Sequence, residues 1–166
     1  MDLNKINNKK NFYEKMHQGA LLTAGDLNKF NTMTIGWATT GVIWGKDVVI
    51  VYVRPSRYTY EFMEENELFT VSFYDEKYKK EIGYLGVKSG RDTNKVADCN
   101  FHPIDFNGST TFEEANLSIL CKKLYYQDLD DKMIPEDIKK RYYQNKKDGN
   151  YEDFHRIYIG EIIDIL

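Results

Sequence analysis

The segment RPSRYT at residues 54–59 concentrates groups that could hold a phosphate. It follows an apolar run and opens a pattern typical of a helix, for which Ser56 is the expected N-cap. The unbonded N–H groups at a helix start carry partial positive charge, and each guanidinium offers forked donors, so this chemistry favours an anion. The alternative is an ordinary capped helix whose arginines are solvated. The candidate ligands are Arg54, Ser56, Arg57 and Thr59.

A second candidate lies at residues 31–37, with the sequence NTMTIGW. Its amide and hydroxyl groups would suit the polar atoms of a planar heteroaromatic ligand, and its apolar surface would suit the ring face. The alternative is a half-buried strand whose threonines simply favour β structure. The candidate residues here are Asn31, Met33, Thr34 and Trp37.

A third candidate, KSGRDTNK at residues 88–95, is basic and contains a glycine. It could close over an anion, or it could be a solvated surface loop. Its last residue, Lys95, lies at the start of a short helical pattern.

The sequence lacks the motifs of several other kinds of site. It contains no GxGxxG or GxxxxGK[ST] nucleotide loop, no GxSxG nucleophile motif and no HExxH. Its three histidines and two cysteines show no spacing typical of a metal site, and Cys121 is expected to pack as a small hydrophobic residue. We therefore expect no metal site, and no catalytic triad is indicated.

A mainly β fold must position these segments. Strand patterns lie at 19–25, 33–39, 47–53, 68–74, 115–127 and 156–166, with a loop expected at 26–31 and a bend or short turn at 40–46. Helical patterns lie at 58–65, 76–87 and 94–98, and another begins near Pro135. Because strands and helices do not alternate regularly, a doubly wound parallel sheet is not expected. A closed or partly closed barrel of six or seven strands with short helical insertions fits better.

Length and composition narrow the protein class. A chain of 166 residues predicts one domain, which we place at 12–166 after a flexible tail at 1–11. The net charge of −3 argues against a mainly electrostatic nucleic-acid partner. No apolar run is long enough to cross a membrane, the N-terminal residues are polar, and cysteines are few, so we expect a cytoplasmic protein.

Taken in order, these segments resemble the flavin reductase-like family with the FMN-binding split-barrel fold, near its flavoredoxin branch. The resemblance covers about residues 17–166 and rests on four motifs. They are Asn31-x-Met33-Thr34-x-x-Trp37, the RPSRYT segment, SGRD with Lys95, and His155 ahead of IGEI at 159–162.

The resemblance implies a six-stranded antiparallel split barrel, usually a homodimer, with FMN near the interface. By position, the four ligands of the RPSRYT segment would hold the phosphate. The four residues at 31–37 would border the isoalloxazine and ribityl chain, and Lys95 would reach the flavin from its loop. Gln127 and His155 are weaker candidates for the rim of the pocket. No protein residue is expected to act as an acid or base, because the flavin carries the chemistry.

The resemblance also implies the reaction class, which is movement of electrons from NADH or NADPH to flavin or another acceptor. An alternative is a flavoredoxin-type protein whose tightly bound FMN exchanges electrons with a redox partner protein. A further alternative is a non-catalytic barrel that binds a phosphorylated ligand.

Overall fold

The computed structural model describes residues 12–166, so the tail expected at 1–11 lies outside the described residues. Nine strands are described: β1 (Ala20–Asp26), β2 (Lys29–Ile35), β3 (Ala38–Ile43), β4 (Lys46–Val53), β5 (Leu68–Phe73), β6 (Pro103–Phe106), β7 (Ser109–Phe112), β8 (Leu117–Asp128) and β9 (Arg156–Ile165). The α-helices are α2 (Phe12–Gln18), α3 (Tyr58–Glu65), α4 (Lys79–Val87), α5 (Lys95–Asp98) and α6 (Glu136–Tyr142). Single 3₁₀ turns lie at Glu76–Tyr78 and Asp131–Met133.

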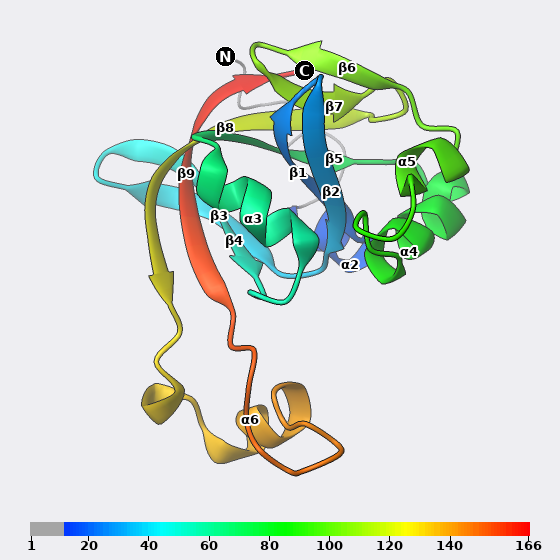
Figure 1. Ribbon diagram of the computed structural model, residues 1–166. Coiled ribbons are helices and arrows are strands. Elements are labelled where there is room, and N and C mark those ends of the chain that lie inside the picture. Colours follow the sequence, from blue (N-terminus) through cyan, green and yellow to red (C-terminus); the bar gives the residue numbers. More distant parts are fainter. Residues whose placement is uncertain (1–11) are drawn as a thin grey trace.

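Seven strands form one antiparallel sheet in the order β2-β1-β5-β8-β9-β4-β3, and β6 and β7 form a separate two-stranded ribbon. The expected mainly β architecture with short helices is confirmed. The strand count of six is too low, because β3 and the β6–β7 ribbon were not predicted as strands. The sheet curls around α3, which packs on β1 and β2, while α4 packs on β2 at the side of the sheet (Figure 1).

The curl requires a close approach between strands near Gly160 in β9. A Cβ atom at this position would lie 2.4 Å from Phe69 Cζ and 2.8 Å from Cys121 Cβ, so only glycine fits there. The register of β8 against β9 also shifts twice, between Leu120 and Cys121 and between Lys123 and Tyr125. Such bulges bend a strand and increase its twist.

Two buried clusters stabilise this sheet. The larger one joins α2 and α3 to the inward faces of the strands, including Phe69, Val71 and Phe73 of β5. The other face of β5 is also buried, because Thr70 and Ser72 bond to β7 at Thr110 O (2.7 Å) and Thr111 Oγ1 (2.9 Å). The smaller cluster lies under α4 and contains Leu21, Tyr74, Ile82, Leu85, Phe101 and Phe112.

Tight hairpins lie at the loop expected at 26–31 and at the bend or short turn expected at 40–46. Asp26 Oδ1 accepts hydrogen bonds of 2.9 Å from the backbone N–H groups of Asn28 and Lys29, so β2 begins at Lys29. The strand expected at 33–39 is instead divided: β2 ends at Ile35, and β3 begins at Ala38. At the second hairpin, Trp44 and Gly45 both have positive φ (55° and 69°), the conformation of a two-residue type I′ turn. A turn was expected within 40–46, but it is confined to these two residues, and the residues before it belong to β3.

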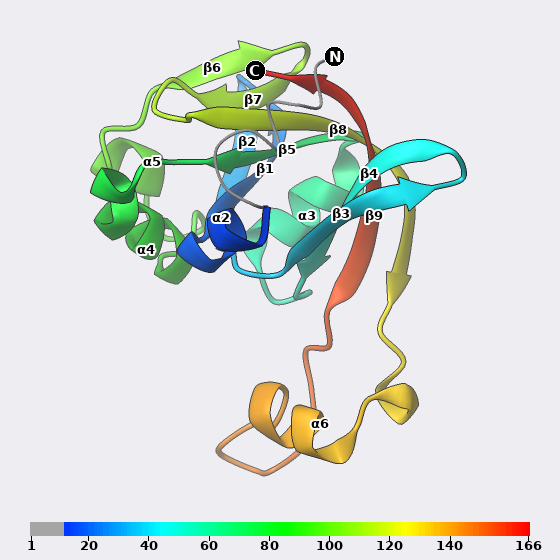
Figure 2. The same cartoon turned by 180° about the vertical axis from the view of Figure 1, so that it is seen from behind.

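The segment between β8 and β9, residues 129–155, is called the arm here. β8 and β9 extend together beyond the rest of the sheet, and α6 lies at the far end of the arm (Figures 1 and 2). The helix expected near Pro135 is confirmed as α6, whose N-cap is Pro135. No helix in the described part of the chain is long and apolar enough to cross a membrane.

Candidate functional site

The turn between β4 and α3 carries the RPSRYT segment. Pro55 follows the strand, and Arg57 N donates to Arg54 O (3.0 Å), which closes the turn. The N-cap of α3 is Arg57, without a side-chain capping bond, so the expectation that Ser56 caps the helix is wrong. The Ser56 hydroxyl instead donates to Asp153 Oδ2 in the arm (2.6 Å). The helix start therefore keeps N–H groups that a ligand could bind.

A small cavity of about 70 Å³ lies against this helix start, and we call it the small cavity. It has room for only a few water-sized groups, which suits a phosphate and excludes a tricyclic ring. Its walls come from β2, the β4–α3 turn, α4 and the loop before α5: Asn31, Met33, Ser56, Arg57, Tyr58, Thr59, Leu85, Gly86, Val87, Lys88, Ser89, Gly90 and Lys95. Three separate candidates from the sequence thus meet at one place.

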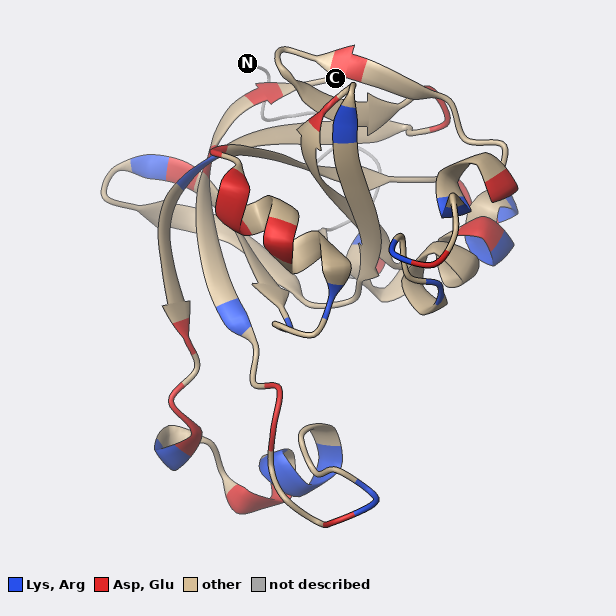
Figure 3. Ribbon diagram, viewed as in Figure 1, with Lys and Arg blue, Asp and Glu red and all other residues tan. Residues whose placement is uncertain are grey.

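Among residues 12–166, the cations Arg57, Lys88 and Lys95 line this space and lie in no ion pair. Within residues 12–166, Arg54 pairs with Asp153 and Arg91 with Glu61, whereas Arg57 and Lys95 lie within ion-pair distance of no carboxylate. Lysine and arginine residues occur at the start of α3 and on the loop between α4 and α5 (Figure 3). Unpaired cations at a helix start create a local preference for an anion.

Lys95 is buried, with 4% of its surface exposed, although it carries an ammonium group. Its Nζ donates to Leu85 O (2.8 Å) and Lys88 O (3.0 Å), which leaves one of three N–H donors for a ligand. Burial, and then the charge of Arg57, lower the pKa of Lys95 to about 8. A buried cation is costly without a counter-ion, so an anion bound here would stabilise it.

Asn31 of β2 and Thr59 of α3 line the small cavity and contact each other. Asn31 Nδ2 donates to Thr59 Oγ1 (2.7 Å), and both side chains are buried. Because Thr59 Oγ1 accepts in this pair, its own hydrogen is free to donate to a ligand. Gly90 packs directly on this pair, since a Cβ atom at Gly90 would lie 2.2 Å from Asn31 Oδ1.

Thr34 and Met33 have different surroundings. Thr34 Oγ1 donates to Ile82 O, which joins β2 to α4. Met33 packs against the main core and also lines the small cavity. Of the four candidates at 31–37, Asn31 and Met33 therefore line this cavity, whereas Thr34 and Trp37 do not.

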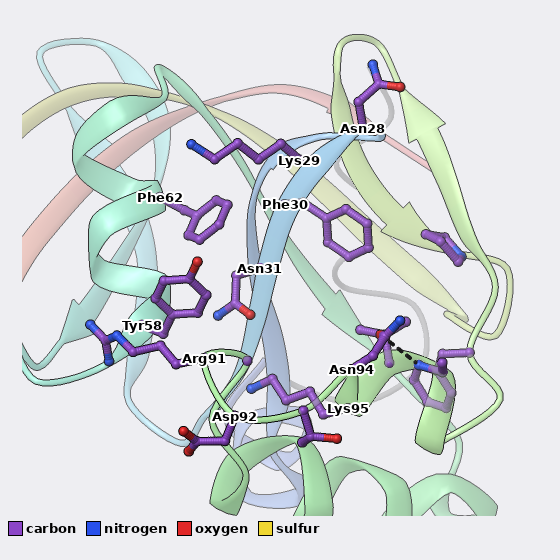
Figure 4. Close-up of a pocket in the computed structure, with 16 residues that line it drawn as sticks. Asn28, Lys29, Phe30, Asn31, Tyr58, Phe62, Arg91, Asp92, Asn94 and Lys95 are labelled. Atoms are coloured by element: carbon purple, nitrogen blue, oxygen red, sulfur yellow. Dashed lines mark hydrogen bonds between the residues drawn. The ribbon is translucent and has the colours of Figure 1, made fainter.

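An open groove of about 720 Å³ adjoins the small cavity and shares Asn31, Tyr58, Gly90 and Lys95 with it. Figure 4 shows Tyr58 and Phe62 of α3 on one side of the groove and Phe30 of β2 on the other, with Lys95 and Asp92 at the lower end. These shared residues place the groove directly beside the small cavity.

The arm gathers Trp37, Arg54 and His155 into a second cluster. The Trp37 ring lies 4.6 Å from the His155 ring and 5.2 Å from Tyr142. Arg54 Nη2 donates to Tyr142 O (2.6 Å), and the Tyr143 hydroxyl lies 2.9 Å from His155 Nδ1. Burial, followed by the charge of Arg54, lowers the pKa of His155 to about 4, so its imidazole is neutral at pH 7.

Gln127 lies apart from both groups. It is exposed on β8, pairs with Ile157, and accepts a hydrogen bond from the Tyr125 hydroxyl (2.7 Å). It lines neither the small cavity nor the groove. The site residue that sequence reasoning missed is Asp153, which touches Ser56 and Arg54. A single acidic residue in a polar insertion gives no sequence signal for a contact with a turn 97 residues away.

Comparison with known proteins identifies the family. A family model described as "Flavin reductase like domain" matches residues 15–166, and no curated protein sequence matches the chain. Flavoredoxin from Methanosarcina acetivorans is similar in structure, with a TM-score of 0.68, 23% identity, and coverage of 89% of this chain and 67% of that one. Flavoredoxin of Desulfovibrio vulgaris (Miyazaki F) has a TM-score of 0.66 and 21% identity, and the match covers 89% of this chain and 68% of that one.

An FMN-binding domain of a flavin reductases-like enzyme from Shewanella baltica OS155 is also similar, with a TM-score of 0.66 and 19% identity; the match covers 99% of this chain and 74% of that one. At these identities the structures show a common fold, the antiparallel split barrel expected from the sequence. The family model spans nearly all of the described residues, so this chain belongs to the flavin reductase-like domain family.

Proposed function

We propose that the protein binds FMN, with the phosphate in the small cavity, and acts as a flavin reductase-like oxidoreductase that takes electrons from NADH or NADPH. The observation that carries this proposal is the pair of unpaired cations, Arg57 and Lys95, at an uncapped helix start. A cavity of about 70 Å³ suits the phosphate and requires the flavin ring to lie outside it.

Different residues would bind the phosphate, the ribityl chain and the ring of FMN. Arg57, Lys95 and the first N–H groups of α3 would bind the phosphate, and the Thr59 hydroxyl would donate a further bond. Asn31 would orient Thr59, and Met33 would supply apolar surface beside the ribityl chain. The isoalloxazine ring would lie towards the arm, where Trp37 and His155 offer flat surfaces. Because the lowered pKa of His155 keeps its imidazole neutral, this side chain would add no charge near the ring.

When bound, the flavin would supply hydride and electron transfer. The chain's part is to hold the ring in place and to limit the access of water through the groove. Trp37 and the arm residues Tyr142 and His155 would cover one face of the bound ring. Arg54 is held by Tyr142 and Asp153, so its guanidinium would stay in one position beside the site.

We also propose that the protein is a homodimer. Val42 and Trp44 at the β3–β4 hairpin are 69% and 65% exposed, and Tyr125 and Tyr126 of β8 are also exposed. The rings of Trp44 and Tyr125 lie 6.3 Å apart, so these two side chains form one exposed apolar surface. Size-exclusion chromatography with light scattering tests the dimer, and a mass near 19.6 kDa would contradict it.

We also propose a cytoplasmic location. Both cysteines are free thiols, as is usual for proteins of a reducing compartment.

Two measurements test the function. Titration of the protein into FMN, followed by flavin fluorescence, should show saturable binding that is tighter than binding of riboflavin. Steady-state oxidation of NADH or NADPH with FMN should exceed the rate without enzyme. Binding without nicotinamide oxidation would instead favour a flavoredoxin-type carrier reduced by a partner protein, and equal affinities for FMN and riboflavin would contradict the phosphate site.

A further inference from the structure

The arm places a carboxylate of the chain itself on the RPSRYT segment. Asp153 Oδ1 accepts a hydrogen bond from the backbone N–H of Ser56 (2.9 Å), and Oδ2 accepts one from the Ser56 hydroxyl (2.6 Å). Arg54 Nη1 lies 3.7 Å from the same Oδ2 atom. A backbone N–H, a hydroxyl and a guanidinium are the donors that a phosphate would use, so Asp153 fills an anion-binding position.

This position adjoins the small cavity. Ser56 both lines the small cavity and holds the Asp153 carboxylate. The unpaired cations Arg57 and Lys95 face the same cavity, whereas Arg54 is neutralised by Asp153. A phosphate in the cavity would therefore bind beside a fixed negative charge.

We propose that Asp153 is a specificity-determining residue that weakens the binding of phosphorylated ligands relative to their unphosphorylated forms. The inference rests on the proposed function, because it takes the small cavity as the phosphate site. Two effects act in the same direction. The carboxylate repels the phosphate, and it occupies the donors of Ser56 and the charge of Arg54, which the phosphate would otherwise use.

The direction of the effect separates this role from a structural one. If Asp153 only held the turn in place, its loss would lower the affinity for every ligand of the site. If it competes with phosphate, its loss raises the affinity for FMN and leaves riboflavin unchanged. Asp153→Asn is the suitable variant, because Asp153 has a positive φ of 57° that asparagine tolerates, and the amide oxygen still accepts a hydrogen bond from Ser56.

The chain offers a matched control one residue away. Glu152 is also in the arm, and its Oε1 accepts a hydrogen bond from Asn145 Nδ2 (2.7 Å) rather than from the RPSRYT segment. Glu152→Gln changes the net charge by the same amount as Asp153→Asn. A general effect of net charge would therefore appear in both variants.

The experiment measures dissociation constants for FMN and riboflavin by flavin fluorescence at one fixed ionic strength. The ratio of the riboflavin constant to the FMN constant should rise about fivefold in Asp153→Asn and change by less than about twofold in Glu152→Gln. An unchanged or lower ratio in folded Asp153→Asn protein would overturn the inference.

Inorganic phosphate provides a readout that does not depend on flavin. The rise in melting temperature caused by phosphate should be larger for Asp153→Asn than for wild type and Glu152→Gln, because tighter binding stabilises the folded state more. If wild-type protein binds neither flavin, the proposed function fails, and the phosphate measurement still decides whether Asp153 opposes anions. Equal phosphate effects in all three proteins would overturn the inference.

Discussion

The side-chain amide of Asn31 donates a hydrogen bond of 2.7 Å to the hydroxyl of Thr59, and this contact joins strand β2 to the first turn of helix α3. Gly90, in the loop between α4 and α5, lies against the same amide. The three segments that the sequence marks as candidates therefore meet where Gly90 packs on the buried Asn31–Thr59 pair.

The first prediction concerns Gly90. In Gly90→Ala the new methyl group would lie 2.2 Å from Asn31 Oδ1 and 3.2 Å from Tyr58 Cδ1, so the loop or the amide must move. We expect the free energy of unfolding to fall by about 1–3 kcal/mol, measured by urea denaturation. Gly83→Ala is the control, because no atom lies within 4 Å of its added methyl group. Since Gly83 lies within α4, this change should stabilise the protein by about 0.5–1 kcal/mol. Equal effects of the two substitutions would contradict the packing described here.

The second prediction concerns the phosphate ligands. Arg57→Ala combined with Thr59→Ala should weaken FMN binding by at least about tenfold, because a charged hydrogen bond contributes ~1.5–3 kcal/mol. Riboflavin binding should change much less, since it lacks the phosphate. Arg91→Ala is the matched control, because Arg91 pairs with Glu61 and lines the groove but not the small cavity. If the folded double variant binds FMN as tightly as wild type, the phosphate lies elsewhere.

The third prediction concerns pH. The pKa of Lys95 is lowered to about 8, so in the free protein its ammonium loses its proton as the pH rises through that value. The charged form favours a phosphate, and the phosphate itself is already dianionic above about pH 7. FMN affinity should therefore fall up to about tenfold between pH 7 and pH 9, while riboflavin affinity stays constant. Lys95→Arg should remove this dependence, because arginine keeps its charge. A pH profile shared by FMN and riboflavin would contradict a role for Lys95 at the phosphate.

The fourth prediction concerns His155. Its folded pKa is lowered to about 4, whereas an unfolded histidine titrates near ~6.5. Between these values the unfolded chain binds a proton that the folded chain does not, so stability falls as the pH falls from about 6.5 towards 4. His155→Gln keeps a hydrogen-bond partner for Tyr143 and removes the titration. Its free energy of unfolding should depend less on pH in this range than that of wild type, as urea denaturation at several pH values would show. An equal pH dependence would mean that other groups cause the loss.

Local patterns predicted those parts of the fold in which neighbouring residues decide the structure. The helix at 58–65 and the alternation of Phe69, Val71 and Phe73 in β5 are confirmed, because the spacing of apolar residues along a helix or strand is a local property. Strand β3 was not predicted, because the turn expected over 40–46 is confined to Trp44 and Gly45, where a bulky residue adopts positive φ.

The candidate site was predictable only in part, because its motifs are local in sequence and the contacts between them are not. The motifs around Asn31, Arg57 and Lys95 could be read one by one, and the structure brings all three to the small cavity. The sequence offered no means of separating Arg57 from Arg54, since the separation depends on Asp153 in the arm. The contact between Asp153 and Ser56 joins residues 97 positions apart, and nothing in either local sequence indicates it.

The measurement that tests the central claim most directly is the visible absorption spectrum of the protein with FMN, recorded without oxygen before and after addition of NADH or NADPH. We predict a protein-bound flavin spectrum that loses its absorption on addition of the nicotinamide. A protein that fails to take up added FMN would contradict the claim that this chain is a flavin-binding oxidoreductase.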